Sequence, residues 1–175
     1  MKRVLAIAAL TVFTFQSGAL FGQTTDPIPS IRQRYAAINK SLAKYRKVRK
    51  DLAGFSAEGG QLVAYFKGQS IMKIAATYYG EGGRTVEEYF YWEDKLIFAF
   101  RKDLKYSRPL SGKVVSTEEN RFYFNGDELI MWIDGSGKEV ARGSEYVEKQ
   151  TEYLKTSKLL TDGARSRKPT IEAID

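Results

Sequence analysis

The chain has 175 residues and a formal net charge of +7, and it contains neither cysteine nor histidine. These two absences exclude disulfide bonds, Ser-His-Asp and Cys-His catalysis, and the usual His and Cys sites for zinc or copper. Carboxylate, Tyr, Lys, Ser and Arg chemistry remains, and the sequence predicts no metal or other cofactor.

Residues 1–22 predict a cleavable signal peptide. Lys2 and Arg3 are followed by an apolar run over residues 4–15, and Ser17 and Ala19 supply small residues for cleavage. The run is shorter than the ~20 residues that cross a bilayer as a helix. We therefore expect export to the periplasm or to the outside of the cell; a retained membrane anchor is the alternative.

Residues 31–52 predict an amphipathic helix. Ser30 and Gln33 have the spacing of a capping box, and Gly54 follows the end of the pattern. Apolar residues recur at steps of three and four at Ile31, Tyr35, Ile38, Leu42, Tyr45, Val48 and Leu52. Such a stripe is suited to covering one face of a sheet.

Alternation with a period of two predicts strands from residue 61 to residue 133. The strands are expected at residues 61–67, 71–78, 85–92, 95–101, 121–124 and 128–133, with a loop over residues 102–116 that could contain a short strand at 114–115. A weak repeat of an aromatic residue, a turn and two aliphatic residues recurs at 66–72, 91–97 and 124–130. This repeat indicates successive hairpins of one antiparallel sheet.

Ser144 is placed to cap a last helix over residues 145–160, which Asp162 and Gly163 should end. The predicted fold class is α+β, with an N-terminal amphipathic helix packed on an antiparallel β-meander of about six strands and a C-terminal helix. Residues 23–163 should form this single domain, and residues 164–175 should form a mobile polar tail.

Aromatic residues supply the first candidate site. Neighbouring residues of a strand point to opposite faces, so both faces of the sheet should carry aromatic side chains. One set should be core, and the other could line a groove for an apolar ligand. The candidate ligand-binding residues are Tyr89, Tyr91, Tyr123 and Trp132.

Basic residues off the apolar stripe supply the second candidate. Lys40, Lys44 and Lys47 would lie on one side of the predicted helix and could face lipid phosphate or another polyanion. An ordinary solvated surface is the alternative. Nucleic acid is not expected as a partner.

Two acidic pairs supply the third candidate. Glu87 with Glu119, or Glu88 with Glu118, could meet if their strands were neighbours in a suitable register, and two carboxylates can hydrolyse glycosides. Exposed structural carboxylates are the alternative.

The leading hypothesis is an exported, non-enzymatic binding or accessory protein whose partner is a protein or an apolar ligand. The first alternative is a carrier or sensor of lipid-like molecules at an anionic membrane surface. The second alternative is a carboxylate-dependent hydrolase.

Overall fold

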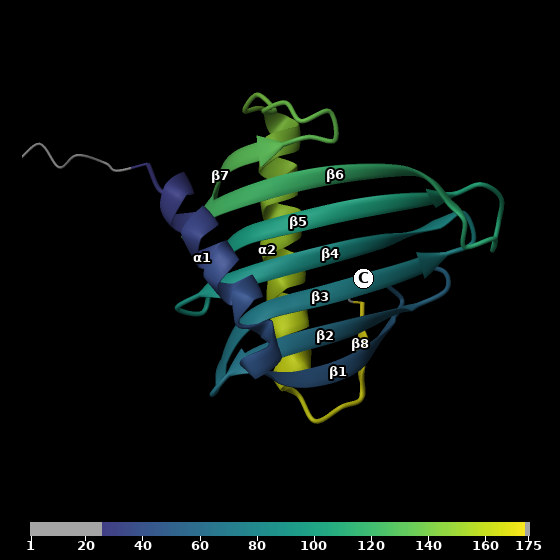
Figure 1. The fold of residues 1–175 in the computed structure, drawn as a ribbon, viewed down its shortest axis with the longest axis horizontal. Helices are drawn as coiled ribbons and strands as arrows, with labels where there is room; N and C mark the ends of the chain where they lie inside the picture. The colour runs from purple at the N-terminus through teal and green to yellow at the C-terminus, as the bar shows by residue number, and fades with distance from the viewer. Residues whose placement is uncertain (1–25, 174–175) are drawn as a thin grey trace, which may run out of the picture.

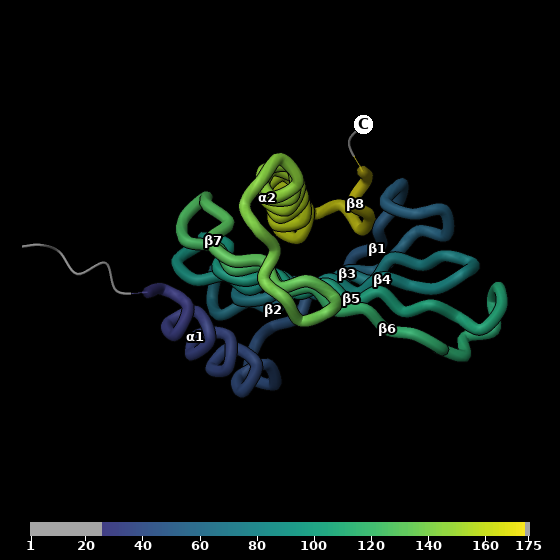
Figure 2. The backbone as a smooth tube through the Cα atoms, turned by 90° about the horizontal axis from the view of Figure 1, so that it is seen from above, coloured from purple at the N-terminus to yellow at the C-terminus, as the bar shows by residue number. Residues whose placement is uncertain are grey.

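The computed structural model describes residues 26–173, which form a sheet with one helix on each face (Figures 1 and 2). In chain order the elements are α1 (Ile28–Lys40), the 3₁₀ turn η1 (Leu42–Lys44), β1 (Arg46–Ala53), β2 (Gly60–Lys67), β3 (Ser70–Gly80), β4 (Gly83–Trp92), β5 (Lys95–Tyr106), β6 (Val114–Asn125), β7 (Glu128–Ile133), α2 (Ser144–Arg165) and β8 (Thr170–Glu172). The predicted signal peptide lies outside the described residues.

The sheet has eight strands in the order β7-β6-β5-β4-β3-β2-β1-β8, and every pair is antiparallel except β1 with β8. The α+β class and the large antiparallel sheet are therefore confirmed. The sheet is larger than the six strands predicted, because β1 and β8 were not recognised.

The predicted helix over residues 31–52 is wrong in its second half. α1 ends at Lys40, and residues 46–52 pair with β2 from Arg46↔Phe66 to Leu52↔Gly60. In this segment Val48 and Leu52 fit a helical period, but they also fit a period of two with Lys50 between them. Pairing with β2 satisfies the backbone groups along the strand and overrides the local helical pattern.

The start of α1 also differs from the predicted capping box at Ser30. The helix begins at Ile28, whose N–H donates to Asp26 Oδ1 at 3.0 Å. Ile31 and Ile38 bury their side chains against the sheet, as the apolar stripe predicted. Leu42 and Tyr45, which follow α1, also pack against this cluster, whereas Val48 and Leu52 belong to the cluster beneath α2.

The weak sequence repeat corresponds to three tight hairpins, β2–β3, β4–β5 and β6–β7. In each, the strand register shifts immediately before the aromatic residue of the repeat, and such irregularities redirect side chains. Each aromatic residue then lies opposite an aliphatic one: Phe66 opposite Ile71, Tyr91 opposite Leu96, and Phe124 opposite Leu129. All six side chains are buried in one cluster beneath α2.

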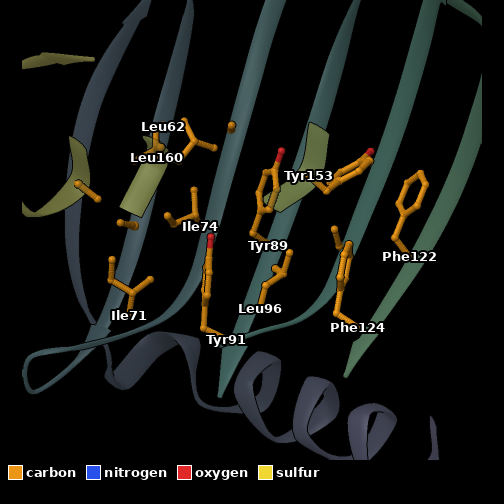
Figure 3. Packing of buried hydrophobic residues seen from close by; sticks show 14 of the residues in the cluster. Leu62, Ile71, Ile74, Tyr89, Tyr91, Leu96, Phe122, Phe124, Tyr153 and Leu160 are labelled. Atoms are coloured by element: carbon orange, nitrogen blue, oxygen red, sulfur yellow. The ribbon is translucent and has the colours of Figure 1, made fainter. Parts of the chain in front are cut away.

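α2 crosses the strands and covers this cluster (Figure 1). Tyr153 of α2 packs with Phe122 and Tyr89, at ring-centroid distances of 4.2 and 5.9 Å (Figure 3). The helix continues past the expected end at residue 160. Gly163 lies within the helix. Its lack of a side chain leaves room for Ile171, because a Cβ atom at Gly163 would lie 2.5 Å from Ile171 Cδ1.

The segment predicted as a mobile tail contains β8. Ile171 is buried. The backbone before and after it is hydrogen-bonded to β1: Asp51 N donates to Pro169 O at 3.1 Å, and Ala173 N donates to Ala53 O at 2.9 Å. Lys50 Nζ donates to the carbonyl oxygens of Ser166 and Lys168. Its buried ammonium group thereby ties the chain that follows α2 to β1.

β5 and β6 are longer than predicted. They pair as far as Tyr106↔Val114, and the connecting loop is confined to residues 107–113. The strands run well beyond both helices at this end of the sheet (Figure 1). Because no helix covers it, its side chains are largely polar and gave no hydrophobic alternation in the sequence.

Candidate functional site

An aromatic pocket of about 350 Å³ lies between α1 and the sheet. It is lined by Ile31, Arg32 and Tyr35 of α1, Phe98 and Phe100 of β5, and Glu119, Arg121 and Tyr123 of β6. Its volume falls at the lower end of the range for small-molecule sites, which are mostly apolar with a few polar groups.

Strand alternation places the aromatic side chains of this pocket on one face. Phe98 and Phe100 are two residues apart on β5, and β6 brings Tyr123 opposite Phe98. The Phe98 and Tyr123 ring centroids lie 4.9 Å apart. Tyr35 of α1 adds an edge-on contact with Phe98 at 5.2 Å, so helix and sheet together form the pocket walls.

Two arginines stand over aromatic rings at this pocket. The guanidinium carbon of Arg32 is 5.8 Å from the Tyr123 ring centroid, and that of Arg121 is 5.5 Å from the Phe100 centroid. Both distances fall within the range of cation–π contacts. The arrangement gives an aromatic pocket a positively charged rim.

The single carboxylate of the pocket is already engaged. The Glu119 carboxylate forms ion pairs with Lys102 Nζ at 3.0 Å and with Arg121 Nη2 at 2.8 Å. The hydrogen bond from Lys102, together with both positive charges, lowers the pKa of Glu119. Within residues 26–173, Arg32 forms no ion pair, so the rim has an excess of positive charge.

The four predicted ligand-binding aromatic residues do not form one groove. Tyr89, Tyr91 and Trp132 are buried beneath α2, whereas Tyr123 lies on the α1 face and lines the pocket described above. Strand alternation separates the two faces of the sheet, but it does not show which face carries a pocket beside its helix. Phe98 and Phe100 are not among the candidates predicted from the sequence, because only the pairing of β5 with β6 connects them to Tyr123.

The predicted basic strip is distributed over three elements. Lys40 ends α1, Lys44 ends η1, and Lys47 lies on β1, so these lysines do not lie on successive turns of one helix. Lys47 Nζ lies 5.6 Å from the Tyr65 ring centroid. All three are exposed.

The acidic pairs proposed from the sequence lie on opposite faces of the sheet. Glu87 is opposite Arg101, whereas Glu119 is opposite Lys102, and neighbouring strand residues face opposite ways. The same alternation separates Glu88 from Glu118. Neither pair can act jointly on one substrate.

Glu87 instead belongs to a buried polar cluster on the α2 face. Tyr89 Oη donates to one carboxylate oxygen at 2.6 Å, and Arg101 donates to the other at 3.2 Å. Burial raises the pKa of Glu87, against the effects of Tyr89 and Arg101. Two further buried hydroxyls, those of Tyr78 and Tyr153, have no hydrogen-bond partner within the described residues.

Arg101 connects Glu87 to a second carboxylate, Asp103. Its guanidinium group donates to both oxygens of Asp103, at 2.7 and 2.9 Å, and Thr85 donates to the same carboxylate at 2.6 Å. Burial opposes ionisation, but these hydrogen bonds prevail and lower the pKa of Asp103. A depression of about 520 Å³ lies alongside, lined in part by Tyr78, Thr85 and Asp103. Two carboxylates line this depression: Asp103, which is bound by Arg101 and Thr85, and Glu118, which accepts a hydrogen bond from Asn120 at 3.3 Å.

Among residues 26–173 no three acidic side chains lie close enough together to hold a metal ion. Neither α1 nor α2, the helices of this described part, has the length and hydropathy needed to span a bilayer.

Comparison of the chain with protein-family models, with curated proteins and with solved structures gave no match.

Proposed function

We propose that this chain is an exported, non-enzymatic binding protein, and that its ligand combines an apolar body with an anionic group. The observation that supports this most directly is the pocket between α1 and the sheet, where aromatic walls meet an arginine without an acidic partner in the described residues. Export follows from the predicted signal peptide over residues 1–22.

The apolar body would lie against Phe98, Phe100 and Tyr35. Phe98 is buried, whereas Phe100 is partly accessible and Tyr35 is 37% exposed. A ligand inserted here would cover the accessible parts of these rings and gain about 25 cal/mol for each Å² of apolar surface removed from water. Aromatic walls also favour flat or chain-like apolar groups.

The anionic group would bind Arg32 at the rim. Arg121 is shared with Glu119, whereas the Arg32 guanidinium contacts only the Tyr123 ring among the interactions observed for residues 26–173. A carboxylate or sulfonate can accept two parallel hydrogen bonds from such a guanidinium group. Fatty-acid-like molecules and aromatic acids satisfy both requirements, which agrees with the carrier of lipid-like molecules considered from the sequence.

Binding of dodecanoate and of dodecanol, measured by displacement of the fluorescent anion 8-anilinonaphthalene-1-sulfonate, tests the proposal. Arg32→Gln should weaken dodecanoate binding by roughly tenfold or more, the size expected for one charge-assisted hydrogen bond, and should leave dodecanol binding unchanged. Phe100→Ala should weaken both ligands.

Arg34→Gln is the matched control, because Arg34 also lies on α1 but stands over Trp92, which does not line the pocket. Equal dodecanoate affinity for Arg32→Gln and Arg34→Gln would exclude Arg32 as the anion-binding residue. If dodecanoate, dodecanol and 8-anilinonaphthalene-1-sulfonate all failed to bind saturably, the proposed ligand class would be wrong.

A further inference from the structure

β6 leaves part of its outer edge without a neighbouring strand. β7 pairs with β6 only over Arg121–Asn125, so residues 114–120 have β5 on one side and, within residues 26–173, no strand on the other. Residues 114–118 are all exposed. The free N–H and C=O groups of such an edge are a template for another strand.

The other edges of the sheet are short, charged or covered. Arg46–Lys50 of β1 lie beyond its pairing with β8, and four of these five residues are basic. β8 has only three residues and directly follows Pro169. On β7, Trp132 O accepts a hydrogen bond from Val140 N at 2.9 Å, and Leu129 N donates to Gln150 Oε1 at 2.8 Å. Short strands, proline and covering segments are the usual devices that prevent edge pairing. Over residues 114–117 the outer edge of β6 has no proline and no covering segment within the described chain; its register with β5 shifts at Val115, and the loop that carries Gly135 lies against the Glu118 side chain.

Two exposed apolar side chains, Val114 and Val115, lie on this free edge, and Leu110 lies in the adjoining loop, where its N–H donates to Glu81 O of the β3–β4 turn. The exposed fractions are 71% for Leu110, 38% for Val114 and 57% for Val115. Elsewhere in the described residues only Tyr35 and Val147 are large hydrophobic residues with comparable exposure. A free strand edge that carries two adjacent exposed valines is a candidate surface for pairing with another chain.

We propose that residues 113–119 pair antiparallel with the same segment of a second copy, with the two-fold axis at Ser116. The two-fold axis of an antiparallel pair stands perpendicular to the sheet and preserves its faces, so opposed residues must lie on the same face. With the axis at Ser116, the two Ser116 residues oppose each other and Val115 lies opposite Thr117. Pairs of β-branched residues across strands are stabilising.

The charges of the segment favour this direction of pairing. Lys113 lies at one end, and Glu118 and Glu119 lie at the other. Antiparallel pairing brings Lys113 of each copy opposite Glu119 of the other, which also binds Lys102 and Arg121 of its own chain, whereas parallel pairing would oppose like charges. The contact is small, so we expect a dimer that dissociates on dilution.

A single cysteine tests the register, because the chain has no cysteine of its own. Directly opposed residues of antiparallel strands have Cα atoms about 4.5–5.5 Å apart, within reach of a disulfide. Under mild oxidation Ser116→Cys should form covalent dimers at least about tenfold faster than Ser107→Cys, because pairing raises the effective concentration of the opposed thiols. Ser107 is an exposed control in the adjoining loop.

Sedimentation velocity on the mature chain tests the dimer without a cross-link. We expect a concentration-dependent monomer–dimer equilibrium that Val115→Lys abolishes and that Val147→Lys, a matched exposed valine on α2, leaves intact; circular dichroism confirms that both variants fold. A chain that stays monomeric at all concentrations overturns the proposal. So does a dimer that survives Val115→Lys, or equal cross-linking of the two cysteine variants.

Discussion

Tyr89 donates a 2.6 Å hydrogen bond to the carboxylate of Glu87, two residues earlier on β4, and both side chains are buried on the α2 face. Glu87 lies at the boundary between the apolar core beneath α2 and the polar end of the sheet that no helix covers. Burial raises its pKa, while Tyr89 and Arg101 partly offset that effect.

The raised pKa predicts how Glu87 affects stability. A folded state that holds a proton more tightly than the unfolded state is favoured at low pH, and this contribution is lost as the pH rises above the ordinary glutamate value of 4.5 through the folded-state pKa. Glu87→Gln, which stays neutral, should therefore gain stability relative to the native chain as the pH rises from 4.5 to 8.

Urea unfolding of both proteins across this pH range provides the measurement. Other titrating groups, including Asp103 with its lowered pKa, are common to the two proteins and cancel in the difference. A difference in the free energy of unfolding that does not change with pH would mean that Glu87 has the same pKa in both states.

Two tyrosines of the α2 face predict contrasting effects of removing one hydroxyl. Tyr89→Phe leaves Glu87 without its closest donor and should destabilise the fold by about 1–3 kcal/mol. Tyr153→Phe removes a buried hydroxyl that has no partner within the described residues and should be neutral or stabilising. Thermal and urea unfolding of the two variants compare them directly. The reverse order would show that the Tyr153 hydroxyl has a bound partner, such as water.

Gly163→Ala should disturb β8. Alanine is the better helix former by about 1 kcal/mol, but its Cβ would overlap the side chain of Ile171, and such overpacking costs about 1–3 kcal/mol. We expect no net gain in stability and faster hydrogen exchange at Asp51 N and Ala173 N, which bond across the β1–β8 junction. Gly82→Ala is the control, because nothing lies within 4 Å of its added methyl group. Unchanged exchange at both amides would show that β8 accommodates the methyl group.

The export prediction concerns residues outside the described part of the chain. If residues 1–22 are a signal peptide, protein recovered from the periplasm or medium should begin between Leu20 and Thr24. N-terminal sequencing or intact mass gives the answer. Full-length protein retained in the cytoplasm with Met1 would contradict export.

Local patterns were sufficient for the hairpins between β2 and β7. Period-two alternation and tight turns such as Asn125-Gly126 are encoded within a few residues, so the strands were predictable. β1 was not, because residues 46–52 fit both a helical and an extended period, and only pairing with β2 decides between them. β8 was missed because a three-residue strand carries almost no signal and depends on β1 and Lys50 for its place.

By itself, the sequence excluded disulfide bonds and sites that need His or Cys within these 175 residues. It also determined the mixed α+β class and the aromatic character of both sheet faces, because these depend on composition and short-range periodicity. Tertiary structure alone decided which aromatic residues are core and which line a pocket. Tyr89 and Tyr123 look equivalent along the chain and both are buried, but Tyr89 packs beneath α2, whereas Tyr123 also lines the pocket beside α1. The reason is physical: the exposure of a strand residue depends on which helix packs over it, and that contact joins segments far apart in the sequence.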